Sequence, residues 1–330
     1  VYIPPYNNKQ TISLGAKYSP DDICMPFKYN LGNYINALNN GANILVQAGG
    51  GCRYGYFAEL QEQILKDLGY KFNFVNLIKN NHVSIKNMYK FAKQENKKLK
   101  IIKFIYYLFQ GILIIIFMDK LDKYKRENMG YAENKKDFQI AEKKMHNSYL
   151  SKKLGIIKIT KIYFKYKKIY KNIKLKPIPR IKILLIGELY SLMDSEASNN
   201  IENTLIEQGI EVIRYTNLTY LLLIKKLKQK IVLYKSKKYL KYHLGADGTE
   251  SIQHSLYHCK KGINGIIHIK SFSCVPEINA MPILSKIGEE YNTPILYLSF
   301  DGENNIANID TKLEAFDIIY MNKKVATWEK

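Results

Sequence analysis

Short apolar strands alternate with helices in two separate stretches of this chain, and the alternation limits its fold more than any other feature. In the first stretch, residues 41–48 are an apolar run closed by glycines, residues 57–68 have helical spacing, and residues 70–77 return as a strand. In the second, residues 181–187 have the sequence Ile-Lys-Ile-Leu-Leu-Ile-Gly, which is typical of a strand buried on both faces. Strands separated by helices pair in parallel, so the pattern predicts an α/β protein.

The second stretch continues this alternation to near the end of the chain. Helices are predicted at residues 200–208 and 276–291, and strands at residues 211–215, 263–269 and 294–299. Together the two stretches predict two doubly wound, parallel-sheet (Rossmann-like) domains.

Lysine-rich sequence of helical periodicity separates the two stretches. We therefore divide the chain into an amino-terminal α/β cluster-binding domain (residues 1–79), a helical segment (residues 80–176) and a carboxyl-terminal α/β domain (residues 177–330). Pro177 and Pro179 interrupt regular structure and mark the second boundary.

One segment, residues 101–118, is apolar over about the minimum length that spans a bilayer. It contains Lys103 and Gln110, which disfavour a membrane span. The apolar periodicity of residues 104–121 instead predicts a core helix packed on both sides. We therefore expect no membrane partner and a cytoplasmic location; no signal peptide is recognised at the start of the chain.

The chain has 51 Lys and Arg residues against 29 Asp and Glu, a formal net charge of +22. Such an excess raises nucleic acid as a partner. However, the lysines are spread along the chain, and no helix-turn-helix, zinc-finger or aromatic RNA-binding motif accompanies them. Nucleic-acid binding is therefore disfavoured, and the charge is expected to steer an acidic redox partner or an anionic substrate.

Three cysteines lie in short loops framed by glycine, proline or basic residues. Cys24 is followed by Met-Pro-Phe-Lys, Cys52 lies between three glycines and Arg53, and Cys274 is followed by Val-Pro-Glu. Because no Cys-x-x-Cys pair is present, all three are equally compatible with small buried core residues. Backbone amides and a cation, however, stabilise thiolate and sulfide charge. The local sequences thus favour an iron–sulfur site in which one iron is not ligated by cysteine.

The remaining cysteine and the histidines carry weaker signals. Cys259 lies in a helical pattern and is interpreted as structural. His254 and His258 are four residues apart on the same pattern, but a pair without a third ligand is more often incidental.

Several motifs resemble the 2-hydroxyacyl-CoA dehydratase family, and most closely its activase-related or dehydratase-like branch. The similar segments follow the family's order and are distributed over most of the chain's length: residues 14–55, 186–190, 245–248, 272–277 and 311–316. Family members usually carry one more strand–helix unit before this point, so the resemblance implies truncation at the amino terminus. The family's Arg-Pro-Tyr-Glu is replaced here by residues 125–127, Lys-Arg-Glu.

The resemblance implies a cofactor, its ligands and its partners. Cys24, Cys52 and Cys274 would ligate a [4Fe–4S] cluster, with a double-cubane cluster as the less favoured alternative. An ATP-hydrolysing activase of the actin/Hsp70 type would reduce it, in the cytosol of an anaerobic cell. The chain would be a lyase or reductase acting on an acyl-CoA or other small molecule, or a non-catalytic electron carrier or activator subunit. It would work as a homo- or heterodimer.

Three further residues are candidates at this site. Arg53 would hydrogen-bond cluster sulfide or form a surface salt bridge. Glu277, three residues after Cys274, would cap the following helix, the favoured role, or act as a proton donor. Glu188 follows a predicted strand, where it is a candidate catalytic residue or makes structural bonds between domains. Since Cys52 and Cys274 both follow strand ends, the cluster is expected in the interdomain cleft.

Overall fold

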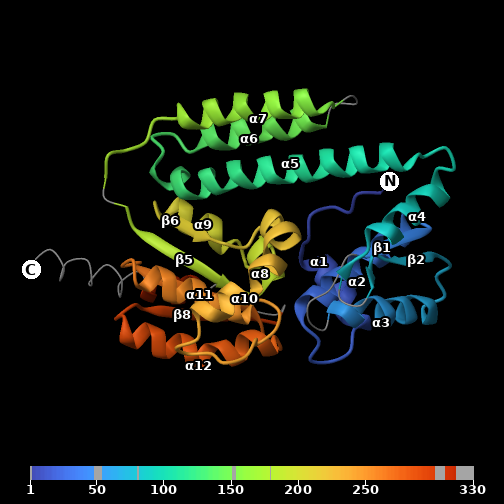
Figure 1. The fold of residues 1–330 in the computed structure, drawn as a ribbon. Coiled ribbons are helices and arrows are strands. Elements are labelled where there is room, and N and C mark those ends of the chain that lie inside the picture. The colour runs from blue at the N-terminus through green and yellow to red at the C-terminus, as the bar shows by residue number, and fades with distance from the viewer. Residues whose placement is uncertain are drawn as a thin grey trace, which may run out of the picture.

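The described residues form an amino-terminal lobe, a layer of long helices and a carboxyl-terminal lobe (Figure 1). The structure is a computed structural model of the chain, and it describes residues 2–47, 54–79, 82–150, 154–178, 180–301 and 309–316. Parallel sheets lie in both lobes, so the α/β class predicted from the sequence is confirmed.

The amino-terminal lobe is built on one βαβ unit. Strands β1 and β2 pair in parallel, with Leu45 opposite Phe74. The elements are α1 (Lys9–Tyr18), α2 (Met25–Asn39), β1 (Ile44–Gln47), α3 (Tyr54–Asp67), β2 (Asn73–Asn76) and an antiparallel pair, β3 (Ile78–Lys79) and β4 (His82–Val83). Leu45 packs with Phe27 and Leu31 of α2 in a small core of this lobe.

The carboxyl-terminal lobe contains a four-stranded parallel sheet of order β6-β5-β7-β8. Its elements are β5 (Lys182–Gly187), α8 (Leu189–Met193), α9 (Ile201–Glu207), β6 (Glu211–Arg214), a π-helical turn η2 (Tyr220–Ile224), α10 (Lys225–Lys235), α11 (Gly248–Cys259), β7 (Gly265–Ser271), α12 (Val275–Glu290) and β8 (Ile295–Phe300). Each predicted strand of this lobe is present to within two residues at either end.

Both faces of this sheet are covered, which explains the continuous apolar run of β5. Ile183 and Leu185 pack into one core, together with apolar residues of α9, α1 and α2. Leu184 and Ile186 point to the other face and pack against α11 and α12. Successive side chains of a strand alternate between faces, so a strand covered on both sides is apolar throughout.

Four helices connect the two lobes in the described part of the chain: α4 (Ile85–Glu95), α5 (Ile101–Asn128), α6 (Lys136–Tyr149) and α7 (Ile156–Lys171). A 3-10 turn, η1 (Met129–Tyr131), follows α5. Figure 1 shows α5, α6 and α7 as a layer running side by side over the lobes. Aromatic stacking holds the layer together, since the rings of Phe117 on α5 and Tyr163 on α7 are 4.2 Å apart and nearly parallel.

The prediction that residues 104–121 form a core helix packed on both sides is wrong. Only 11% of the apolar window of α5 is buried. Within the described residues, it is the single helix long and apolar enough to cross a membrane by length and composition. The reason lies in its neighbours: α7 covers one side, and only the carboxyl-terminal end of α5 reaches the sheet, where Arg126 is buried beside Asp122.

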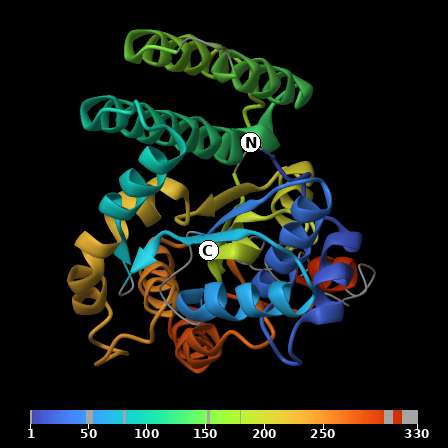
Figure 2. The ribbon, with the colours of Figure 1, turned by 90° about the vertical axis from the view of Figure 1, so that its right-hand side faces the viewer.

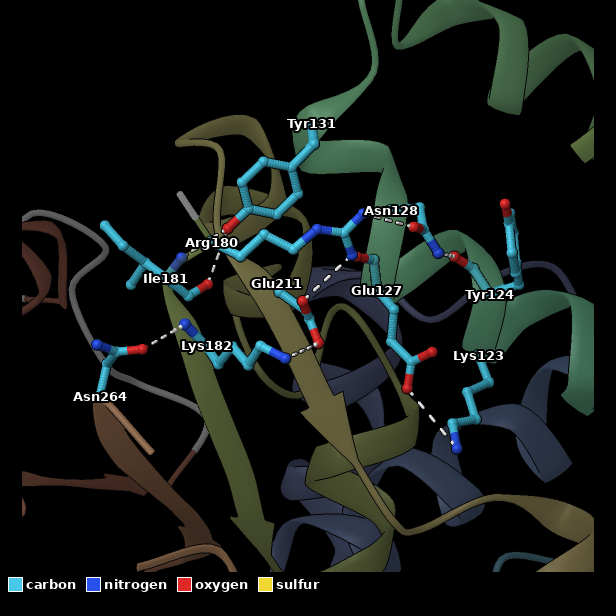
Figure 3. Close-up of polar contacts among 10 residues, drawn as sticks. All are labelled: Lys123, Tyr124, Glu127, Asn128, Tyr131, Arg180, Ile181, Lys182, Glu211 and Asn264. Carbon is cyan, nitrogen blue, oxygen red and sulfur yellow. Dashed lines mark hydrogen bonds and ion pairs between the residues drawn. The ribbon is translucent and has the colours of Figure 1, made fainter. Parts of the chain in front are cut away.

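A polar joint connects the helical layer to the sheet (Figure 3). The guanidinium of Arg180 donates to Glu211 on β6 at 3.3 Å and to Asn128 at the end of α5 at 3.1 Å. The hydroxyl of Tyr131 accepts from the backbone N–H of Ile181 at 2.8 Å and donates to its carbonyl at 3.0 Å. These contacts fix the entry of the chain into β5.

The two lobes also contact each other directly. Asn7, just before α1, donates through its amide to the hydroxyl of Tyr190 and to Asp194, both at 2.7 Å. The ring of Tyr29 on α2 stacks on Tyr190, with ring centres 5.8 Å apart. Helices α1 and α2 therefore lie against the carboxyl-terminal ends of the large sheet's strands.

Candidate functional site

Cys24 and Cys274 occupy equivalent positions at the beginnings of two helices. Cys24 is the N-cap residue of α2 and Cys274 that of α12, and each is followed by a proline in the first turn. Both cysteines are half-buried. The amino-terminal end of a helix carries unpaired N–H groups and partial positive charge, which favour an anion such as a thiolate.

One residue, Ser271, connects the two cysteine segments. Its hydroxyl oxygen accepts the backbone N–H of Met25, the neighbour of Cys24, at 3.0 Å. Its carbonyl oxygen accepts the backbone N–H of Cys274, also at 3.0 Å. Ser271 is buried at the end of β7, so the contact is shielded from water. The structure thereby brings together two of the three predicted ligand segments, which are far apart in sequence.

The third predicted ligand, Cys52, and the candidate Arg53 lie outside the described residues. The convergence of three sulfur atoms therefore stays a prediction. Among the residues that the structure does describe, no group of three or more His, Cys, Asp or Glu side chains is placed to hold a metal ion.

Two buried polar side chains that are close in sequence to predicted ligands have no hydrogen-bond partner in the described part of the chain. They are the hydroxyl of Ser273, next to Cys274, and the amide of Gln47, at the end of β1. The chain runs from Gln47 toward Cys52. An unpartnered buried polar group is costly, by about 1–3 kcal/mol. A bound group with polar or anionic atoms would satisfy them, and the sulfides of a cluster are of this kind.

A buried lysine also lies at this end of β7, and the sequence analysis missed it. Lys270 is only 4% exposed and donates to the carbonyl of Phe272 at 3.2 Å. Burial lowers the pKa of its amine, while the charges of Cys274 and Glu277 oppose this shift. The sequence could have indicated this residue, because a lysine inside the largely apolar strand Ile-Ile-His-Ile-Lys-Ser is unusual. Its positive charge suits a site for thiolates.

Glu277 does not make the helix-capping bonds that the sequence analysis favoured. It lies in the first turn of α12 but is completely buried. One carboxylate oxygen is 2.8 Å from Nε2 of His268 on β7, and the other accepts from the hydroxyl of Ser251 on α11 at 3.2 Å. The physical reason is packing: α11 and α12 cover the sheet together, and the short path to His268 directs the side chain inward. Glu277 therefore links β7, α11 and α12.

Glu188 makes hydrogen bonds within the carboxyl-terminal lobe, and none of those to described residues joins the two lobes as its structural alternative expected. It is the N-cap residue of α8 and accepts from the backbone N–H groups of Tyr190 and Ser191 at 2.9 and 3.0 Å. The hydroxyl of Ser191 also donates to it, at 2.6 Å. Burial raises the pKa of Glu188 to about 7, although these hydrogen bonds act in the opposite direction.

Two more acidic residues are buried near the start of α11, and the sequence analysis did not select them. Asp247 pairs with Lys225 at 2.6 Å. Glu250 is completely buried, and its two carboxylate oxygens have no hydrogen-bond partner among the described residues. Burial raises the pKa of Glu250 to about 7, with the charge of Lys225 opposing the shift.

The pKa of Glu250 leads to a prediction for Glu250→Gln. Folding raises the pKa of Glu250, so the group's contribution to the free energy of unfolding is fully present below about pH 4.5. This contribution is lost as the pH rises to about 7, because the unfolded chain releases the proton more easily than the folded chain. The glutamine variant has no such charge to bury. At pH 8 we expect it to be more stable than the wild type by about 3 kcal/mol, and at pH 4.5 about equal.

Urea denaturation between pH 4.5 and 8 measures this difference. Glu289→Gln, at an exposed position on α12, serves as the control and should follow the wild type at every pH. Parallel curves for Glu250→Gln and the wild type would mean that the buried carboxylate does not titrate in this range.

His254 and Cys259 are packed inside the carboxyl-terminal lobe. His254 stacks on Tyr215 with ring centres 4.0 Å apart, and burial lowers its pKa to about 3, so it is neutral. Cys259 ends α11 and lies in the core beneath the large sheet.

Comparison with protein-family models gave no match to this chain, and comparison with curated proteins gave none either. The resemblance described above therefore rests on the quoted motifs alone.

Proposed function

We propose that this chain is an iron–sulfur redox protein resembling components of 2-hydroxyacyl-CoA dehydratases, with a [4Fe–4S] cluster on Cys24, Cys52 and Cys274. One observation carries the proposal: Ser271 accepts hydrogen bonds from both Met25 and Cys274. These bonds connect the beginnings of α2 and α12, the two helices that have Cys24 and Cys274 as their N-cap residues.

The chemistry of the surrounding residues supports this assignment. Two helix N-termini and the amine of Lys270 favour negative charge at this place. Ser273 and Gln47 offer polar atoms that lack partners in the described part of the chain. When bound, a [4Fe–4S] cluster supplies single electrons, and an iron without a cysteine ligand accepts an exogenous ligand. The chain's own residues orient the thiolates and neutralise part of their charge.

The finer fold description belongs to the same proposal. We infer two Rossmann-like, doubly wound domains, with the cluster between them at their strand ends. A cytoplasmic location, a dimeric assembly and reduction by an ATP-dependent activase follow from the resemblance. Acyl-CoA is the proposed substrate class, and the lysine-rich surface would attract its phosphates.

Serine substitution of the two described ligands tests the proposal. The wild-type protein, reconstituted under anaerobic conditions, should contain about four iron and four sulfide ions per chain. Cys24→Ser and Cys274→Ser should each retain less than about half of this iron, because a cube that loses a thiolate ligand is labile. Iron and sulfide analysis with EPR of the reduced protein provides the measurement.

Cys259→Ser is the matched control, because it changes a cysteine in the core away from the site. It should keep the iron content of the wild type. Equal iron in all three variants would contradict the proposed ligands. With the cluster established, an EPR signal that shifts on adding acyl-CoA would support the enzyme, whereas an unchanged signal and electron transfer to a partner protein would favour the carrier.

A further inference from the structure

The first turns of α5 present an apolar face to solvent. Ile102, Ile105 and Phe109 are 77%, 54% and 52% exposed. Their spacing of three and four residues places them in one row on the helix. Ile112 and Ile116 continue the row toward the middle of α5 and are half-buried. A soluble protein rarely exposes such a row of apolar side chains, so the row indicates a binding surface.

Lysines surround the beginning of this row. Lys97, Lys98, Lys100 and Lys103 are all exposed. Residues 96–118 contain no Asp or Glu. The apolar row is therefore framed by positive charge that no acidic residue of the same stretch neutralises.

A second exposed row of the same character lies on η2 and α10. It consists of Leu223, Leu227, Ile231 and Tyr234, spaced four, four and three residues apart, with Leu227 80% exposed. Exposed lysines flank this row at positions 228, 230 and 235. Because a second helix also exposes an apolar row flanked by lysines, the exposed row on α5 is not readily explained as incidental.

A hydrogen bond connects α5 to the segment that leads into η2 and α10. A carboxylate oxygen of Asp119 on α5 accepts the backbone N–H of Thr219, just before η2, at 2.6 Å. In Figure 2, α4 and the beginning of α5 (teal) and α10 (gold) lie along the left-hand edge of the molecule. The two helices thus lie toward the same side of the molecule in this view, and we call their exposed apolar rows together the α5–α10 surface.

The charge and the residue types of the α5–α10 surface indicate its binding partner. A second copy of the chain would bring lysines against lysines, which is repulsive, so an anionic partner is favoured. Isoleucine, leucine and phenylalanine in a row, with lysine and tyrosine at the margins, are typical of helices that lie in a membrane interface. We propose that the α5–α10 surface binds anionic lipid bilayers peripherally, with both helices lying along the headgroup region. This reverses the expectation of no membrane partner and is independent of the proposed cluster.

Sedimentation of the full chain with lipid vesicles tests this proposal. The wild type should bind vesicles containing about one third phosphatidylglycerol and should bind pure phosphatidylcholine vesicles at least about tenfold more weakly. High salt should release it, because screening weakens attraction between lysines and anionic headgroups. Equal binding to both vesicle types, or no binding to either, would overturn the proposal.

Two variants locate the binding surface. The double variant Ile102→Ser and Phe109→Ser should weaken binding by at least about tenfold, since it removes apolar groups that enter the interface. Ile140→Ser, on α6, is the matched control, because Ile140 is 51% exposed and outside this surface. Circular dichroism confirms that both variants are folded. Unchanged vesicle binding by the double variant, or a change only in its oligomeric state, would show that another surface or a protein partner is involved.

Discussion

Gly187→Ala is expected to lower the free energy of unfolding by about 4 kcal/mol or more. Gly187 ends β5 with φ at +130°, a conformation that side chains with a Cβ rarely adopt. A Cβ here would lie 1.8 Å from the carbonyl oxygen of Ile269. That oxygen belongs to β7, which is paired on both sides, and it accepts the N–H of Glu188 at 2.8 Å. The backbone therefore has no inexpensive way to move aside.

Urea denaturation of the variant measures this effect. Gly111→Ala is the control, because a Cβ added in α5 at that position meets no atom within 4 Å. The control should be slightly more stable than the wild type, by about 0.5–1 kcal/mol, since alanine favours a helix more than glycine does. A loss below about 1 kcal/mol for Gly187→Ala would mean that β5 and β7 separate more easily than their pairing indicates.

Glu277→Ala is expected to have the second-largest effect, a loss of about 3–5 kcal/mol. Glu277 and His268 are both completely buried and 2.8 Å apart. Removing the carboxylate leaves the imidazole without this partner and also releases the hydroxyl of Ser251. Both groups are then desolvated without compensation, and a cavity forms beneath the beginning of α12.

Thermal and urea unfolding of two further variants separate the contributions. Glu277→Gln keeps the size of the side chain and one oxygen acceptor, so it should lose less stability than Glu277→Ala. Glu289→Ala, at an exposed position on the same helix, should stay within about 0.5 kcal/mol of the wild type. If Glu277→Ala resembled Glu289→Ala, the buried pair would contribute little to the fold.

The α/β class and most strand positions could be predicted from the sequence because their signals are local. The run at residues 181–187 is apolar at nearly every position, and the structure places β5 at Lys182–Gly187. The helix predicted at residues 276–291 likewise corresponds to α12 (Val275–Glu290), which begins directly after Cys274. Hydrophobic spacing and proline geometry act over a few residues, so a short window contains them.

The position of α5 could not be predicted in the same way. Its apolar sequence is equally typical of a core helix, a membrane span and an interfacial helix, since all three need apolar side chains. What differs is the set of neighbours. Only the tertiary structure shows that α7 covers one side and that Ile102 and Phe109 remain exposed.

The sequence by itself determined the types of residue available for a site, and tertiary structure decided which of them meet. Cys24 and Cys274 were selected from their loops, but the contact between their segments depends on Ser271, whose partner Met25 is 246 residues away in the chain. Glu277 was assigned a local cap, yet packing of α12 on β7 directs it to His268. The physical reason is that secondary structure follows from interactions between near neighbours, whereas burial and pairing of polar groups depend on segments distant in sequence.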